Sequence, residues 1–492
     1  MTSRGLGGRW GRIALAGALL APAGAGWTRE PTRAELEERI RRLERIIEEA
    51  GLDKPGAKVA PRRVEAPAPP APADAQEVER IVDEKLKKQK VLAGWKDGFF
   101  LESPDGEHKL KINGYAQVQG RFFPNEDGDT GTDSIFLRRM RPTVEATVFR
   151  YFDVKIQPDF GRGRSELADG YLDVRYFGPE ANLRLGKMKV PLSLERLQSG
   201  SNLAFVERSI VNRLTPNRDV GLQLHGSLAG GAVAYQAGVF NGVNDNASGD
   251  GDVTSDKEMA VRVFAEPFRR TDVDPLQGFG LGLGTTYGGQ KKGDDLNALS
   301  YRTVGDSRFF RFAQGSGVVN QADGTKFRIA PQAYWFWGPF HAMGEYVRND
   351  QGVRRAVTDE DTDVTTVTDG RFVNDGWVVQ AGWVVTGEKA SYKGVVPANA
   401  FDPRNGRWGA FEVALRGSRL NVDDDLFDGG FADAGESTTD AWAATAGVNW
   451  YLNKNFKFQL NYEYTGFEDH IEIGDARRDH ENVVLGQFQI QY

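Results

Sequence analysis

Polar and apolar side chains alternate without a break along residues 109–123, KLKINGYAQVQGRFF. Because successive side chains of a β-strand point to opposite faces, this pattern predicts a strand with one wet face and one dry face. The wet face carries Lys109, Lys111, Asn113, Tyr115, Gln117, Gln119 and Arg121, and the dry face carries Leu110, Ile112, Gly114, Ala116, Val118, Gly120 and Phe122. A soluble sandwich would turn the dry face to a core, whereas an outer-membrane barrel would turn it to lipid.

Comparable alternating segments recur from Asp97 to Tyr492, separated by clusters of Gly, Asp, Asn and Pro. Tight links such as Gly338-Pro339 alternate with long polar loops, as in outer-membrane barrels, whose short turns face the periplasm. Two short-side links, 268–277 and 390–405, are longer than this pattern explains. We therefore expect an all-β fold, a 16-stranded antiparallel transmembrane β-barrel, with strands near 109–122, 134–149, 151–163, 167–177, 181–189, 219–229, 231–241, 257–267, 278–291, 325–337, 339–349, 375–389, 406–420, 438–452, 454–467 and 481–492.

The last strand supports the barrel interpretation. In VVLGQFQIQY, apolar residues share one face and the chain stops at the aromatic Tyr492, which resembles the C-terminal assembly signal of bacterial outer-membrane proteins. The barrel-assembly machinery is therefore an expected partner, and the lipid bilayer is another. A soluble β-structure is the disfavoured alternative, since these small alternating faces offer little to bury.

The N-terminal residues predict an exported protein with a helical extension. Arg4, Arg9 and Arg12 precede the short apolar run IALAGALLAPAGA, so residues 1–25 are interpreted as a signal peptide rather than a short membrane anchor. Residues 26–51 form a predicted coiled-coil helix with Leu36, Ile40, Leu43 and Ile47 at the core positions.

The oligomeric state of this helix is open from the residues alone. Ile at a and Leu at d favour two strands, but RIRRLE (39–44) resembles a trimer-specifying motif, which we weight more heavily. A single amphipathic helix on a surface is the alternative. Residues 52–75 predict a Pro/Ala-rich spacer, residues 76–96 a second charged helix ending near Gly94 and the approach to the barrel, and residues 97–492 the barrel itself.

Composition limits the chemistry of the 492 residues. There is no cysteine, the formal net charge is −7, and the five histidines are scattered, so nothing favours nucleic acid, thiolate metal sites or catalysis. We expect no cofactor, no metal site and no catalytic residues. The Asp-rich loops 125–133, 244–256 and 421–433 lack a full EF-hand spacing and are better explained as solvated loops than as cation sites.

Several segments resemble the phosphate-selective porin O and P family. They are RRMRPTVEATVFRYFDVKIQPDFGRG (138–163), ADGYLDVRYF (168–177), LRLGKMKVPLSLERLQSGSNLAFVERSIVNRL (183–214), GWVVQAGWVVTGE (376–388) and GAFEVALRGSRLNV (409–422). The resemblance implies a homotrimer of 16-stranded barrels in the outer membrane, an inward-folded third loop, and arginines and lysines that pass anions.

Strand alternation gives the candidate anion pathway. On the barrel wall it selects Arg139, Arg141, Lys155, Arg175 and Arg184, and the long connection 190–218 adds Arg196, Arg208, Arg213 and Arg218. Guanidinium groups suit oxyanions because they stay charged and offer two parallel donors. Arg208 is the first choice, against the alternative of a structural pair with Glu207. Strand alternation predicts that the side chains of Lys187 and Lys189 point outward unless their strand has ended.

Inward carboxylates allow a second interpretation of the wall arginines. Arg262, Arg328 and Arg416 also point inward on this count, as do Glu145, Asp153, Asp159, Asp173, Glu345, Glu412 and Glu463. Many of the arginines would then only neutralise carboxylates on neighbouring strands.

Three functions remain open. The sequence favours a trimeric diffusion porin for small hydrophilic solutes that leans to anions such as phosphate, with its N-terminal segment in the periplasm. The alternative is a structural protein that tethers the barrel to peptidoglycan through the coiled coil. An outer-membrane β-barrel hydrolase has little support.

Overall fold

The structure, a computed structural model, describes residues 91–492 except 125–130, 252–254, 291–294, 298 and 474–475. Contacts divide the chain into the units Met1–Val78 and Glu79–Tyr492. The predicted signal peptide, coiled coil and spacer, and most of the second helix, lie outside the described residues. No helix within the described part of the chain is long and apolar enough to cross a membrane.

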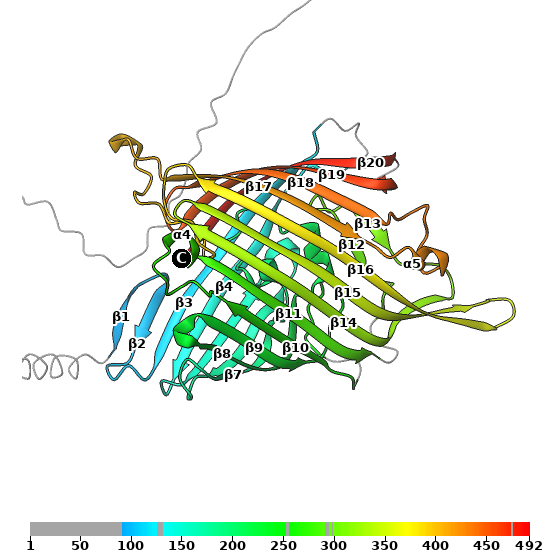
Figure 1. The fold of residues 1–492 in the computed structure, drawn as a ribbon, viewed down its shortest axis with the longest axis horizontal. Coiled ribbons are helices and arrows are strands. Elements are labelled where there is room, and N and C mark those ends of the chain that lie inside the picture. The colour runs from blue at the N-terminus through cyan, green and yellow to red at the C-terminus, as the bar shows by residue number, and fades with distance from the viewer. Residues whose placement is uncertain (1–90, 125–130, 252–254, 291–294, 298, 474–475) are drawn as a thin grey trace, which may run out of the picture. The chain divides into compact units, whose positions relative to one another are not determined.

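Sixteen strands form a closed antiparallel barrel (Figure 1). Each pairs with the next along the chain, and the last pairs with the first through Val484↔Phe122 to Gln491↔Tyr115. The strands are β3 (Lys109–Phe122), β4 (Ser134–Val148), β5 (Phe152–Asp159), β6 (Glu166–Val174), β7 (Asn182–Lys189), β8 (Arg218–Leu228), β9 (Val233–Phe240), β10 (Glu258–Ala265), β11 (Phe279–Gln290), β14 (Val318–Trp337), β15 (Phe340–Thr358), β16 (Thr365–Val384), β17 (Ala410–Asn421), β18 (Asp440–Tyr451), β19 (Phe456–Ile473) and β20 (Ala476–Gln491).

The two faces of the first barrel strand are arranged as the alternation predicts. Gln117 and Gln119 of β3 are 0% exposed and point into the barrel, whereas Val118 and Phe122 are 40% and 42% exposed on its outer face. The wet face therefore points inward and the dry face points to lipid.

A short hairpin precedes the barrel where the second helix was expected to end. β1 (Leu92–Trp95) pairs with β2 (Phe99–Glu102), so the prediction of helix up to Gly94 is wrong for residues 91–94. The turn between the strands is Lys96-Asp97-Gly98, in which Asp97 and Gly98 have φ of 51° and 123°, and such an Asp-Gly pair is a strong hairpin signal. β2 pairs with β3 from Phe99↔Ile112 to Glu102↔Lys109, on the edge of β3 that β20 occupies further along.

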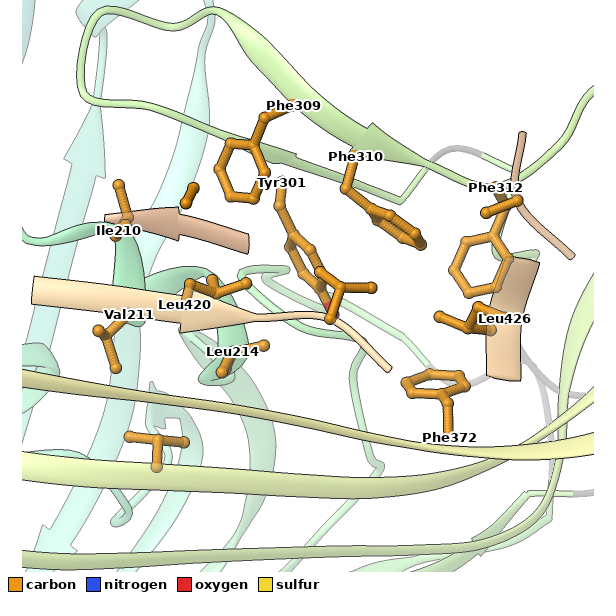
Figure 2. Packing of buried hydrophobic residues seen from close by; sticks show 14 of the residues in the cluster. Ile210, Val211, Leu214, Tyr301, Phe309, Phe310, Phe312, Phe372, Leu420 and Leu426 are labelled. Carbon is orange, nitrogen blue, oxygen red and sulfur yellow. The ribbon is translucent and has the colours of Figure 1, made fainter. Parts of the chain in front are cut away.

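An apolar core of buried residues joins the barrel wall to connections between its strands (Figure 2). The connection between β11 and β14 carries β12 (Ser300–Arg302) and β13 (Arg308–Arg311), which pair as an inner hairpin. Its Tyr301, Phe309, Phe310 and Phe312 are fully buried against the barrel wall, where Phe372 is one partner. The sequence offered no motif for this connection, and its packing closes part of the lumen.

A connection from the opposite end of the barrel also enters the lumen. The segment between β16 and β17 carries Tyr392, whose hydroxyl donates to Leu194 O at 2.7 Å, while Gln198 Nε2 donates to Tyr392 O at 2.9 Å. This contact explains why the 390–405 link is longer than a plain turn. The other long short-side link contains helix α4 (Asp274–Gln277), and helix α5 (Asp425–Asp428) lies between β17 and β18.

Candidate functional site

The connection between β7 and β8, residues 190–217, folds into the lumen and is called here the inner loop. Ser193 caps helix α3 (Leu194–Leu197) by accepting a hydrogen bond from Arg196 N. Glu345 of β15 then accepts from Ser193 Oγ at 2.8 Å, Leu194 N at 2.8 Å and Glu195 N at 3.2 Å. One carboxylate of the wall therefore holds the first turn of the loop.

The second half of the inner loop is held by polar contacts and by packing. Glu195 accepts from Ser209 N at 3.0 Å and from Ser209 Oγ at 2.7 Å, which ties the two halves together. Ile210 and Leu214 of the 3-10 turn Ile210–Leu214 are buried in the apolar core of Figure 2. The loop is thus fixed on both sides and forms part of the wall of a cavity.

This arginine cavity has a volume of about 230 Å³ and a strongly basic lining. Ten arginines and one lysine line it, against four carboxylates. The basic residues are Arg121, Arg138, Arg139, Arg141, Arg162, Arg164, Lys189, Arg196, Arg208, Arg213 and Arg218, and the acidic residues are Asp159, Glu166, Glu207 and Asp306. All four arginines that the sequence selected on the loop, and two of the five wall residues, are therefore brought together.

Two adjacent arginines of β4 both reach this cavity. Gln117 of β3 faces Arg139, but Val118 faces Leu137, so Arg138 is an extra residue at a β-bulge. A bulge interrupts the alternation of faces and re-aims a side chain. The sequence count selected Arg139 and Arg141 and missed Arg138, because a strict period of two places neighbours on opposite faces.

Carboxylates neutralise one part of the lining. Arg141 Nε lies 2.7 Å from Asp159 Oδ2, and Arg218 Nε lies 2.7 Å from Asp169 Oδ1. Arg138 forms a bidentate pair with Glu207. Burial alone would raise the pKa of Glu207, but the pair with Arg138 outweighs burial and holds this pKa below its usual range, so the carboxylate is ionised at neutral pH.

Four other cations are bonded to neutral groups. Arg208 donates to Glu195 O at 3.0 Å and Gln198 O at 2.7 Å, and Arg213 donates to Arg302 O at 2.9 Å and Thr303 O at 3.1 Å. The neutral partners of the other two are Asn212 O, Thr215 Oγ1 and Asn246 Oδ1 for Arg196, and the carbonyls of Arg196, Leu197 and Gln198 for Lys189.

These four side chains therefore have no carboxylate partner at close range. No carboxylate oxygen within the described residues lies within 4.0 Å of them. Arg208 does not pair with Glu207, contrary to the structural alternative for that residue. Lys189 turns toward the inner loop at the end of β7, and Lys187 is buried beside Asp250. The outward direction that strand alternation predicts for these two side chains is therefore not observed.

The remaining wall candidates lie outside the arginine cavity. Lys155 lies 3.3 Å from Asp169, Arg175 pairs with Asp153 beside a short turn, and Arg184 pairs with Asp173. Lys155 also lines a second cavity of about 360 Å³ with Lys393 and Lys454. Arg175 and Arg184 thus follow the pairing interpretation. Arg416 is likewise paired with Glu463, and Arg328 is paired with both Asp245 and Glu258.

Comparison with known proteins assigns the family. The family model of the phosphate-selective porins O and P matches residues 111–492. The chain belongs to this family. The resemblance seen in the sequence is thereby confirmed, and membership makes the protein an outer-membrane porin, a channel and not an enzyme.

Individual relatives are more distant. Porin O of Pseudomonas aeruginosa is 26% identical over 409 residues, which cover 76% of this porin and 86% of that protein. Among solved structures, OmpT of Vibrio cholerae is 12% identical with a TM-score of 0.48, and the alignment covers 78% of this chain and 98% of that chain. The channel DcaP of Acinetobacter baumannii is 11% identical with a TM-score of 0.47, covering 82% and 100%. An anion-selective porin from Comamonas acidovorans is 10% identical with a TM-score of 0.46, covering 78% and 100%.

Proposed function

We propose that this porin passes small hydrophilic solutes with a preference for anions such as phosphate, and that the preference arises at the arginine cavity beside the inner loop. The observation that carries the proposal is the group of four cations, Lys189, Arg196, Arg208 and Arg213, whose partners are neutral. The family description, phosphate-selective porin O and P, agrees with the anion preference, and the name of Porin O agrees with the function of a porin.

The physical argument concerns the charge that a permeating ion meets. A cation paired with a carboxylate presents little net field, whereas one bonded to carbonyl oxygens keeps its full charge. In a narrow pore walled by protein, such a field raises the local concentration of anions and repels cations. Several neighbouring sites of moderate strength let an anion enter and leave, while a single tight site would stop it.

The test is the reversal potential of the purified full-length porin in a planar bilayer under a KCl gradient, repeated with phosphate added. We expect an anion-selective potential and a chloride current that phosphate blocks. A cation-selective or near-zero potential without block would contradict the proposal. In that case the arginines act as partners of the lumen carboxylates, and the phosphate preference does not extend to this member of the family.

A further inference from the structure

Glu207 lies among three arginines from two different elements of the barrel. Its carboxylate accepts hydrogen bonds from Nε and Nη2 of Arg138, with Nη2 at 2.9 Å from Oε2. Arg139 Nη2 lies 3.8 Å from the same oxygen, and Arg162 Nη2 lies 4.0 Å from Oε1. The Glu207 side chain is only 10% exposed, and its single negative charge lies among three positive charges.

The neighbouring residues keep this carboxylate in position. Arg416 Nη1 donates to the carbonyl of Glu207 at 2.8 Å, and the preceding amide, Val206 N, donates to Asn461 Oδ1 at 2.7 Å. On the opposite side, the bulge of β4 turns Arg138 into the lumen. Both partners of the ion pair are thus placed by features that the rest of the fold fixes.

We propose that Arg138, Arg139 and Arg162 form a second oxyanion subsite and that Glu207 occupies it permanently as a tethered anion. Glu207 is then a specificity-determining residue, which keeps permeating oxyanions out of this subsite. The proposal rests on the proposed function, because it concerns where in the arginine cavity the permeating anion binds.

The chemistry of the subsite supports this role. A carboxylate presents two oxygens to a guanidinium fork, as a phosphate does, so it is a close stand-in for an oxyanion. Three arginines without Glu207 would hold a divalent or multivalent oxyanion strongly, and a strongly held ion conducts slowly. With Glu207 in place, the oxyanion meets the cations bonded to neutral groups, such as Arg208, and leaves more readily.

Glu207→Gln tests the proposal, because glutamine keeps the shape and one hydrogen-bonding oxygen but removes the charge. The measurement is block of the chloride current by inorganic phosphate in single channels of the full-length porin. We expect the phosphate concentration for half block to fall about tenfold or more, with longer blocked intervals. An unchanged half-block concentration and unchanged intervals would overturn the proposal.

A loosened inner loop is the competing explanation, and a second variant separates it. The double variant Glu207→Gln with Arg138→Gln has the same net charge at the subsite as the wild type. The phosphate concentration for half block should therefore return to within about twofold of the wild-type value. If the tighter block persists in the double variant, the cause is the loop and the proposal fails. If Glu207→Gln does not assemble, Glu207→Asp serves instead, because it withdraws the carboxylate by one methylene. The phosphate concentration for half block should then also fall, but by less.

A matched control and the wild type complete the design. Asp369→Asn also removes one carboxylate from an arginine pair, with Arg354 on the long strands β15 and β16, and should leave phosphate block unchanged. The wild-type reversal potential tests the proposed function by itself. An anion-selective wild type with no effect of Glu207→Gln therefore refutes only the subsite, whereas a cation-selective wild type refutes the proposed function.

Discussion

The cations of the inner loop are held by neutral oxygens, most of which are backbone carbonyls. A guanidinium in a buried place costs free energy unless it is hydrogen-bonded, and the carbonyls supply those bonds without supplying charge. Burial lowers the pKa of Arg208 from its ordinary value, which is the sign of this cost. Arginine nevertheless stays protonated at neutral pH, so each such residue brings a full positive charge to the cavity.

Arg208→Gln should weaken phosphate block by about tenfold and reduce the anion selectivity of the reversal potential, because it removes one of the uncompensated charges. The loop should keep its fold, since the glutamine amide can still donate to one carbonyl. Arg354→Gln, which removes an arginine that is paired with Asp323 and Asp369 and does not line the cavity, is the control and should change neither quantity. Equal block in wild type and Arg208→Gln would mean that this arginine only supports the loop.

Sequence reasoning located most of this cavity but not all of its chemistry. Arg196, Arg208, Arg213 and Arg218 were selected because they sit together on one long connection, and all four line the cavity. Arg138 was missed because a bulge is a property of strand pairing, which the residues of one strand do not reveal. Some ion pairs join neighbouring strands, as Arg184 and Asp173 do, and follow from the alternation. The pair of Arg138 with Glu207 joins the wall to the inner loop, and a contact of that kind has no local signal in the sequence.

The inner hairpin of β12 and β13 is the element that differs most from an open barrel. Its aromatic residues pack on one another and on the wall, with the rings of Tyr301 and Phe310 5.3 Å apart and those of Phe310 and Phe312 5.5 Å apart. Apolar side chains therefore fill the part of the lumen beside the arginine cavity, and the turn of the hairpin adds Val304 and Asp306 to the lining of that cavity. The barrel strands themselves do not depend on this packing, because their hydrogen bonds run between neighbours around the circle.

Phe310→Ala should release the inner hairpin without unfolding the barrel. Truncation of a fully buried phenylalanine costs about 3–5 kcal/mol, which is comparable to what a short hairpin gains by docking. The expected result is faster cleavage by trypsin at exposed Arg308 in the folded porin, together with a larger and noisier conductance. Leu415→Ala, on the lipid-facing surface at 67% exposure, should change neither. Loss of the folded barrel in Phe310→Ala would show that the hairpin is needed for assembly.

At the scale of elements, the alternation of polar and apolar residues was sufficient to predict the barrel strands. It was insufficient to predict the segments that fill the lumen. Each of the sixteen predicted strands overlaps an observed one, since the side-chain period of two is imposed by the boundary between lipid and water. β12 and β13 were missed because a strand of three or four residues is too short to show a period. The hairpin of β1 and β2 was overlooked for the same reason, after a charged run that favoured helix.

At the scale of the whole molecule, the barrel closes without residues 1–90. The circle of strands from β3 to β20 uses only the part of the chain that begins at Lys109. The coiled coil expected at residues 26–51 is therefore available for another task, which we propose to be support of a homotrimer, with attachment to peptidoglycan as the alternative.

Deletion of residues 26–90 should leave insertion and conductance intact and lower the temperature at which the proposed trimer dissociates. The deletion ends at residue 90 so that the hairpin of β1 and β2 is kept. Heated and unheated samples on semi-native gels, with bilayer recordings of the same preparation, measure both properties. Unchanged trimer stability would favour the tether, and complete loss of insertion would contradict the division of the chain into an extension and a self-sufficient barrel.

The hairpin before the barrel has a consequence for the size of the pore. β20 ends where Tyr492 exchanges backbone hydrogen bonds with Gly114, both at 3.0 Å, and β2 begins its pairing two residues away at Ile112. The two strands run in the same direction along one edge of β3, end to end. β20 therefore has no room to slide along β3 toward the short turns unless β2 is displaced. The hairpin acts as a stop that sets the stagger of the closing seam, and with it the circumference of the barrel.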